Sequence, residues 1–353
     1  MSNDTLNQST DAVIAVSIMI LDAQVVSNAL WAAFGMLGII ACACQIVTTL
    51  HWKPLLKADQ CIIFAIAAGD LLKNLGFGTV GVRRLYATST GGHDVSSQIN
   101  CMIWLYFMVA PMYSVFALMV TLSADRLFGL CFPIRYRNQN VRFKLILIGL
   151  SVFVGTVFST GMFIGVTETP VPVCAYGSSP LPSYRTAAQL FEDVSTCLTL
   201  CLNLCSCAVL FVKWRRAIQL NKDMKIFKKS LQLNAIKTLL VVATLFLISS
   251  TMGGLWFTII DSTGWDQAAK TSWMPVAGCF ELIRAVLDFP IYVLMVEEYR
   301  NGFFAVIAGI RKIILETTSK SVSNPTAPNT IAHSATIGAK GVLGRQAIAV
   351  NHA

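Results

Sequence analysis

The stretch Ser123-Ala124-Asp125-Arg126-Leu127, followed by Cys131-Phe132-Pro133-Ile134-Arg135-Tyr136-Arg137, ends an apolar run that begins near Cys101. As a helix, the segment from Cys101 to Arg126 would rise about 37 Å, slightly more than the hydrocarbon core of a bilayer. A cysteine is therefore expected at one membrane face and an acid–base pair at the other. Such a pair can act as a switch if the arginine changes partner. A basic flank that only anchors the helix is the alternative interpretation.

The composition is that of a membrane protein. The chain is 55% hydrophobic and only 13% charged, and its mean hydropathy is +0.64, far from the usual balance of soluble proteins. Apolar stretches long enough to span a bilayer predict an all-α membrane protein, a bundle of seven transmembrane helices. These stretches cover residues 26–50, 61–82, 99–124, 143–166, 190–212, 233–260 and 271–296.

The basic residues predict the orientation of these spans. With the N-terminus outside, 21 of the 27 Lys and Arg residues lie on the inner side and 4 on the outer side. This bias favours an extracellular N-terminus and a cytoplasmic C-terminus in the plasma membrane. The sequons at Asn3 and Asn7 fall on the predicted outer side and are expected to be glycosylated. The net charge of +9 is attributed to loops facing anionic lipid, not to nucleic-acid binding.

The chain is expected to divide into four regions. They are an extracellular tail at 1–24, a seven-span domain at 25–298, an amphipathic surface helix at 299–315 and a disordered cytoplasmic tail at 316–353. Within the first region, Val13–Leu21 either lengthens the first helix or lies along the outer surface.

Two of the eleven cysteines stand apart from the rest. Cys101 opens the third span and Cys174 lies in the outer loop between the fourth and fifth spans, so these two alone face the oxidising side. A disulfide between them would pin this loop across the outer mouth. Cys197, Cys201 and Cys205 share a helix face, but they lack His or acidic partners at ligand spacing, so they predict packing and no metal site.

Together, the seven spans, the cysteine pair and the Asp-Arg at the end of the third span resemble the rhodopsin-like (class A) G-protein-coupled receptors. The sequence around Asp125 and Arg126 is most similar to that of the nematode Srsx-type serpentine chemoreceptors. The resemblance covers about residues 25–312. It implies a receptor that binds an extracellular ligand and activates a heterotrimeric G protein through an inner surface that includes Asp125, Arg126, Arg135 and Tyr136.

The resemblance also implies an activation core. Asp70 lies in mid-span, where a charge is costly, and it matches the family's sodium-binding acid, so sodium is a candidate ion there. The seventh span ends Asp288-Phe289-Pro290-Ile291-Tyr292, which keeps the family's acid-to-tyrosine spacing but displaces the proline by one. If Asp70 and Asp288 face each other, a proton or a sodium ion has to relieve their repulsion.

Several family features are missing. Gly38-Ile39 stands where the family has Gly-Asn, the fourth span lacks its tryptophan, and the fifth lacks its proline and inner tyrosine. The sixth span has no Trp-x-Pro; Gly253-Gly254 either supplies flexibility there or allows close packing. The fold prediction is unaffected, whereas the usual activation switches are in question.

The outer half predicts a small chemosensory ligand, with a peptide as the alternative. Met108 replaces the aspartate of amine receptors, and Leu282 replaces the lysine that binds retinal in opsins. Glu281 and Arg284 share one helix face with Asp288, which indicates either ligand contact or an internal ion pair. The candidate ligand-binding residues are Trp104, Phe107, Met108, Trp256, Glu281 and Arg284.

Other functional classes fit less well. A seven-span ligand-gated channel of the insect odorant-receptor type has its N-terminus inside, which would reverse the charge bias. An enzyme is not expected, because the four histidines, His51, His93, His333 and His352, are scattered and no nucleophile constellation is visible; no cofactor is predicted. Beyond the surface helix, tail hydroxyls offer phosphorylation sites for an arrestin-like partner. They are Thr317, Thr318, Ser319, Ser321 and Ser323.

Overall fold

The computed structural model describes residues 3–52, 60–90, 96–171, 182–219, 231–264, 273 and 275–322. The chain divides into two compact units, Met1–Ile307 and Ala308–Ala353. Cys174 and most of the expected cytoplasmic tail lie outside the described residues.

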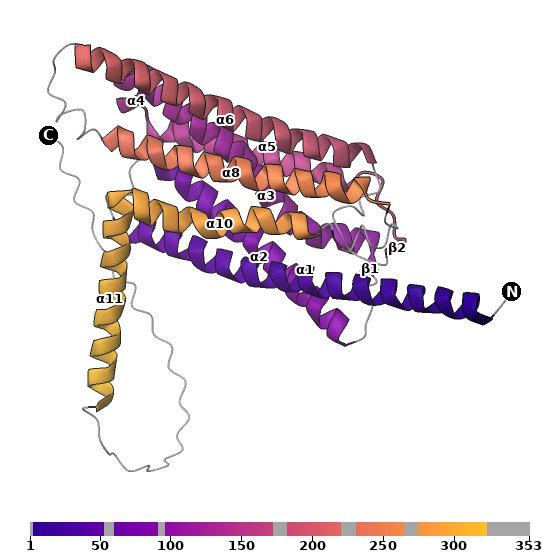
Figure 1. Cartoon of the computed structure of the whole chain (residues 1–353). Helices are drawn as coiled ribbons and strands as arrows, with labels where there is room; N and C mark the ends of the chain where they lie inside the picture. Colours follow the sequence, from indigo (N-terminus) through magenta and orange to yellow (C-terminus); the bar gives the residue numbers. More distant parts are fainter. Residues whose placement is uncertain are drawn as a thin grey trace. The chain divides into compact units, whose positions relative to one another are not determined.

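The first unit contains the predicted bundle of seven helices (Figure 1). They are α1 (Asn3–His51), α2 (Cys61–Ser89), α3 (Gln98–Cys131), α5 (Val141–Thr160), α6 (Pro182–Gln219), α8 (Leu231–Ser262) and α10 (Pro275–Met295). Shorter elements are helix α4 (Pro133–Arg137), the 3-10 turn η3 (Gly161–Phe163) and strands β1 (Ser96–Ser97) and β2 (Pro170–Val171). Helix α11 (Glu297–Val322) follows α10.

Hydropathy alone identifies five of these helices as candidate spans among the described residues. They are Val25–His51, Cys61–Ser89, Gln98–Cys131, Val141–Phe163 and Thr186–Lys213. The sixth helix, α8, contains the shorter apolar stretch Thr244–Ile260. The seventh, α10, carries Glu281, Arg284 and Asp288 within its 21 residues, which is why it stands out less by hydropathy. Helix α1 starts at Asn3, so the region expected to form a tail is helical, including Val13–Leu21.

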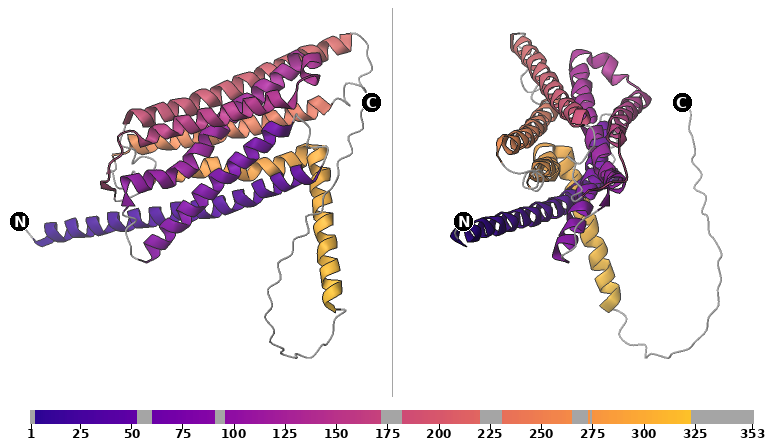
Figure 2. Two further views of the ribbon diagram at one scale, coloured as in Figure 1. Left: turned by 180° about the vertical axis from the view of Figure 1, so that it is seen from behind. Right: turned by 90° about the vertical axis from the view of Figure 1, so that its right-hand side faces the viewer.

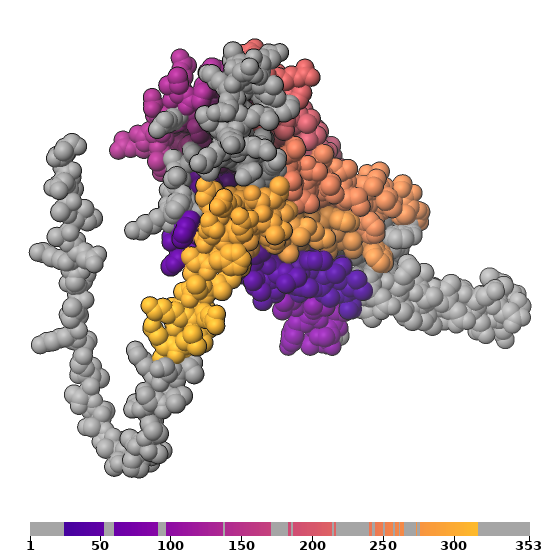
Figure 3. Space-filling view, turned by 60° about the vertical axis from the view of Figure 1, so that its left-hand side comes forward, coloured from indigo at the N-terminus to yellow at the C-terminus, as the bar shows by residue number. Residues whose placement is uncertain are grey.

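Helix α3 occupies the middle of the bundle. It packs against α2, α5 and α6, and more than half of its residues are buried (Figure 2). Its start is defined by Ser97, whose side chain accepts a hydrogen bond from the Asn100 amide. Helix α1 packs against α2 and α10, and the surfaces of α1 and α10 meet in Figure 3.

Glycines allow two pairs of helices to approach closely. A Cβ added to Gly35 of α1 would lie 2.7 Å from the Cα of Gly78 in α2. A Cβ on Gly155 of α5 would lie 2.3 Å from the backbone nitrogen of Ser114 in α3. Both distances are far below van der Waals contact, so these crossings depend on the missing side chain.

The described residues that follow α5, up to Val171, are held at the N-terminal end of α3. Strands β1 and β2 pair antiparallel, with Ser96 opposite Val171 and Ser97 opposite Pro170. The Gln98 amide donates to the Thr169 carbonyl at 2.9 Å, and the Gln98 side chain accepts from the Thr167 amide at 3.1 Å. These contacts bring the loop that leads to Cys174 close to the helix that contains Cys101.

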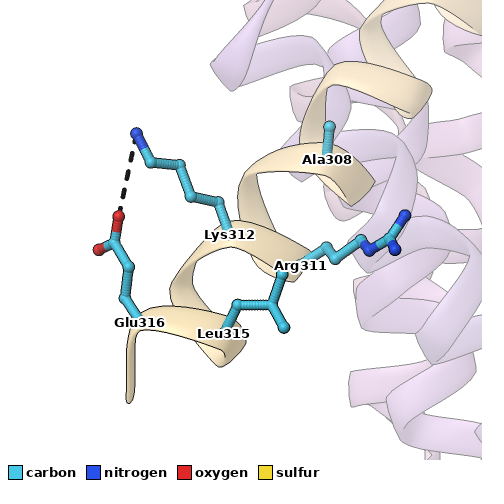
Figure 4. Close-up of a pocket in the computed structure, with 5 residues that line it drawn as sticks. All are labelled: Ala308, Arg311, Lys312, Leu315 and Glu316. Atoms are coloured by element: carbon cyan, nitrogen blue, oxygen red, sulfur yellow. Dashed lines mark ion pairs between the residues drawn. The ribbon is translucent and has the colours of Figure 1, made fainter. Parts of the chain in front are cut away.

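Helix α11 exposes a row of apolar side chains. They are Phe304, Ile307, Ile310, Ile313, Ile314 and Leu315. A shallow depression on the same helix is lined by Ala308, Arg311, Lys312, Leu315 and Glu316, where Lys312 and Glu316 pair at 3.9 Å (Figure 4). All five lining residues come from one helix, so the depression is part of an exposed helix face. Apolar and charged side chains side by side are typical of a helix at a membrane interface.

Candidate functional site

Five charged side chains meet inside the bundle and are called the central charge cluster here. Asp70 and Lys73 come from α2; Glu281, Arg284 and Asp288 come from α10. All five are less than a tenth exposed. Spacings of three and four residues place each set on a single helix face, so the sequence itself aligns the charges that the bundle then brings together.

Arg284 lies between two acids from different helices. Its NH2 is 2.7 Å from Oδ1 of Asp70, and its NH1 is 3.0 Å from Oδ2 of Asp288. Lys73 Nζ is 2.8 Å from the same Asp70 oxygen. Asp70 and Asp288 therefore lie on the two sides of one guanidinium fork, which pairs with both of them, and Lys73 supplies the second positive charge.

Glu281 is held more weakly than the two aspartates. Its Oε2 is 3.7 Å from Arg284 Nε and 4.0 Å from Lys73 Nζ, and its Oε1 accepts a 3.4 Å hydrogen bond from Ser249. Glu192 of α6 also interacts electrostatically with Glu281 and Lys73. The five residues of the central charge cluster are three carboxylates and two bases. The carboxylate in excess is Glu281, which has the longest contacts to the bases.

Burial makes this cluster energetically sensitive. Removing one partner from a buried ion pair leaves an uncompensated charge and costs about 3–5 kcal/mol. Arg284 carries most of the contacts, and its guanidinium also lies 5.3 Å from the ring centroid of Phe246 in α8, a cation–π distance. One side chain therefore links α10 to α2 and α8.

The surroundings of Asp70 do not fit a bound sodium ion. Its Oδ1 already contacts two nitrogens, from Lys73 and Arg284, at 2.8 and 2.7 Å. A third cation at that oxygen would be repelled by both of these buried positive charges. Within the described residues, no group of three or more His, Cys, Asp or Glu side chains is arranged to hold a metal.

A second polar group lies where the C-terminal end of α3 meets α4 and α5, on the side of the bundle expected to face inward, and it is called the inner triad. It comprises Asp125 of α3, Tyr136 of α4 and Lys144 of α5. The Tyr136 hydroxyl donates to Asp125 Oδ2 at 2.8 Å, Lys144 Nζ donates to the Tyr136 oxygen at 2.9 Å, and Lys144 Nζ lies 3.5 Å from Asp125 Oδ1. Asp125 and Lys144 are both buried, whereas Arg135, also predicted for this surface, is exposed.

Tyr292 and Tyr299 pack together at the junction of α10 and α11, with their ring centroids 5.2 Å apart. The positive charge of Arg126 in α3 contributes to the electrostatic environment of both hydroxyls. Burial raises the pKa of Tyr299 above its usual value, while hydrogen bonds from Thr49 and Gln45 and the charge of Arg126 oppose this rise. Pro290 lies inside α10, one turn or less from Tyr292.

The predicted ligand-binding residues do not form one group. Trp104 and Phe107 are exposed on α3, and Trp104 lies below the guanidinium of Arg83. Met108 is buried. Its backbone lies close to Gly76 of α2, since a Cβ added to that glycine would be 2.9 Å from it. Trp256 donates to the Trp273 carbonyl at 3.0 Å.

In the first turn of α3, Cys101 is buried and disulfide-bonded. Its predicted partner, Cys174, lies outside the described residues, so the pairing itself stays a prediction. Asn3 and Asn7 lie in the first turns of α1, and their glycosylation also stays a prediction.

Sequence reasoning missed both lysines of these groups. Lys73 was recognisable, because it follows Asp70 by three residues in an apolar span. Lys144 had no such signal. It follows the loop after α4 and looks like one more basic residue at a membrane boundary.

Comparison with known proteins agrees with this architecture. The family model described as 7 transmembrane receptor (rhodopsin family) matches residues 44–288, more than half of the chain. The crystal structure of squid rhodopsin is similar, with a TM-score of 0.62 at 13% identity over 82% of this chain and 87% of that chain. No curated protein matches the sequence.

These findings define a multi-pass, seven-helix membrane receptor. The chain belongs to the rhodopsin family of seven-transmembrane receptors, a receptor family and not an enzyme family.

Proposed function

We propose that the protein is a G-protein-coupled receptor of the plasma membrane that binds a small extracellular chemosensory molecule and activates a heterotrimeric G protein. The main support is the position of Asp125 and Arg126 at the inner end of the central helix. Asp125 is held there by the inner triad, and the charge of Arg126 contributes to the electrostatic environment of Tyr292 and Tyr299, in α10 and α11. A surface of this kind is where a cytoplasmic partner would meet the bundle.

The central charge cluster provides a route from ligand to partner. Arg284 joins α2 and α10 midway along the bundle through buried ion pairs, so a ligand that displaces α10 changes contacts on α2 directly. Coupling requires that the ligand bind one arrangement better than the other. We place ligand contact near Glu281, the acid with the longest contacts in the cluster.

The test is a response screen in which the Arg126→Ala variant is the internal control. Cells expressing the full chain are exposed to volatiles, small metabolites and peptides while calcium and cAMP are recorded. Arg126→Ala should abolish every response of the wild type at equal surface density, and Asp125→Asn should raise the basal signal. An Arg126→Ala receptor that reaches the surface and signals normally would refute coupling through this surface.

Topology is tested separately. We expect an extracellular N-terminus glycosylated at Asn3 and Asn7, a Cys101–Cys174 disulfide and a cytoplasmic tail, with α11 lying in the inner membrane interface. An epitope tag after Ala353 should stain only permeabilised cells; staining of intact cells would reverse the orientation. We also propose that the receptor is of the Srsx chemoreceptor type. Its cytoplasmic tail would recruit an arrestin.

A further inference from the structure

One face of α8 lies against the face of α10 that carries the central charge cluster. The two faces meet in three contacts, whose positions are three and four residues apart along both helices, as expected for single helix faces. From the N-terminal end of α8 onward, the pairs are Phe246 with Arg284, Ser249 with Glu281, and Gly253 with Ala277. The order is reversed along α10, because the two helices run in opposite directions. This line of contacts is called the α8–α10 seam.

The contact between Phe246 and Arg284 is the least exposed of the three. The guanidinium carbon of Arg284 lies 5.3 Å from the ring centroid of Phe246, and both residues are 1% exposed. A guanidinium this close to a ring is attracted by the electron-rich face, and the attraction is stronger where water is excluded. The ring therefore gives Arg284 a neutral partner from a third helix, besides its acids on α2 and α10.

The contact between Ser249 and Glu281 is weaker. The Ser249 hydroxyl has two acceptors, the Phe246 carbonyl at 3.0 Å and Oε1 of Glu281 at 3.4 Å. It has only one hydrogen to share between them, and the acceptor on its own helix is the nearer one. The attraction across the α8–α10 seam therefore comes mainly from the ring of Phe246.

The third contact explains one of the two adjacent glycines of α8. A Cβ added to Gly253 would lie 3.6 Å from the Ala277 carbonyl oxygen, an ordinary contact distance, whereas a Cβ added to Gly254 would have nothing within 4 Å. Gly253 thus belongs to the packed seam. Helix α8 contains no proline and lacks the Trp-x-Pro expected in the sixth span. The seam joins α8 to α10 without either feature.

We propose that Phe246 is a positioning residue for coupling: its ring holds α8 to the central charge cluster through Arg284 and keeps α8 in the arrangement described above. This inference rests on the proposed function for its effect on signalling, but not for the contact itself. A ligand that contacts Glu281 and moves Arg284 would release the ring, provided that the ligand binds the released arrangement better. Weakening only the attraction between ring and guanidinium should therefore raise ligand-free signalling.

This attraction can be weakened while both residues keep their places. Each fluorine on the ring withdraws electrons from its face and lowers its attraction for a cation. The full-length receptor is prepared with mono-, di- and trifluorophenylalanine at position 246, and its unfolding temperature is measured in detergent. The unfolding temperature should fall stepwise with the number of fluorines. A ring that only fills space would not behave in this way, because fluorination leaves it no less apolar.

The matched control is the same series at Phe77 of α2. This side chain is also buried, and its ring packs edge-on against Trp31 at a centroid distance of 4.8 Å. Fluorination there adds the same atoms to a buried ring and should cause no stepwise fall. An unfolding temperature that does not depend on the fluorines at position 246, or that falls equally in both series, overturns the proposal.

Signalling gives the functional readout. Ligand-free nucleotide exchange is measured on purified heterotrimeric G proteins with membranes of equal receptor number. Exchange per receptor should rise with each fluorine at position 246, by about fivefold or more for the trifluorinated ring, a typical size for coupling between sites. The Phe77 series should stay at the wild-type level.

The two readouts separate this inference from the proposed function. If the unfolding temperature falls stepwise but no receptor, fluorinated or not, activates a G protein, the proposed function fails and the contact between Phe246 and Arg284 stands. If the wild type activates a G protein and exchange stays constant or falls along the Phe246 series, the role of Phe246 in coupling is overturned.

Discussion

The central charge cluster and the inner triad both stabilise buried acids, but they do so with different chemistry. In the cluster, Arg284 contacts Asp70 and Asp288 directly at 2.7 and 3.0 Å. In the triad, a neutral phenol carries part of the contact, and the direct Lys144–Asp125 distance is longer, at 3.5 Å. Direct ion pairs make the cluster a structural joint between helices. The relay makes the triad easier to rearrange, which suits the coupling surface that we propose for this end of the bundle.

The largest expected effect is from Arg284→Met. It leaves the carboxylates of Asp70 and Asp288 facing each other without the guanidinium, at a cost of about 3–5 kcal/mol. We expect little surface expression and a much lower unfolding temperature in detergent. Arg311→Met, which removes an exposed arginine, is the matched control and should behave like the wild type. Normal thermal stability of Arg284→Met would mean that the cluster is not a structural joint.

Asp125→Asn should cost less than Arg284→Met. Lys144 loses its acid but keeps the Tyr136 oxygen as an acceptor, and the pair that is lost was the longer one, at 3.5 Å. The penalty should therefore be at the lower end of the about 3–5 kcal/mol that a buried ion pair costs when it loses one partner. The measurement is thermal unfolding, with the Asp125→Asn/Lys144→Met double variant as control. The double variant should recover stability because both charges are gone. If Asp125→Asn is as damaging as Arg284→Met, the distinction between the two sites collapses.

The sequence predicts one of these two sites better than the other, because only the charged residues of α10 are spaced along a single helix. Glu281, Arg284 and Asp288 repeat at helical intervals, so their common face and their ion pairs were predictable from α10 alone. The seven spans were predicted from the length of their apolar stretches, although α8 and α10 stand out less by hydropathy than the other five. The inner triad was not predictable, because it requires the α4 turn to place Tyr136 on Gly129 and the start of α5 to bring Lys144 inward. Those contacts are tertiary, and no single helix pattern encodes them.

A smaller effect is expected from Glu281→Gln. Its contacts to Arg284 and Lys73 are 3.7 and 4.0 Å, and neutralising it leaves two carboxylates with two bases. Stability should therefore change much less than in Arg284→Met, because the charges left in the cluster balance and no buried charge is left uncompensated. A ligand response that falls while stability is unchanged would support ligand contact at Glu281. A large loss of stability would show that Glu281 belongs to the joint as firmly as the aspartates do.

The smallest effect is expected from sodium. In a receptor whose central acid binds sodium, replacing sodium chloride with choline chloride at constant ionic strength removes a stabilising ligand, and the unfolding temperature falls as mass action requires. Here Lys73 and Arg284 supply both positive charges at the Asp70 oxygen, so the unfolding temperature should be the same in the two salts. The control is a Lys73→Met receptor, in which one built-in cation is gone and space and charge for sodium are restored. If that variant becomes sodium-dependent while the wild type is not, the protein's own side chains occupy the position of the ion. A wild-type receptor stabilised by sodium would instead place the ion elsewhere in the cluster, next to the excess acid at Glu281.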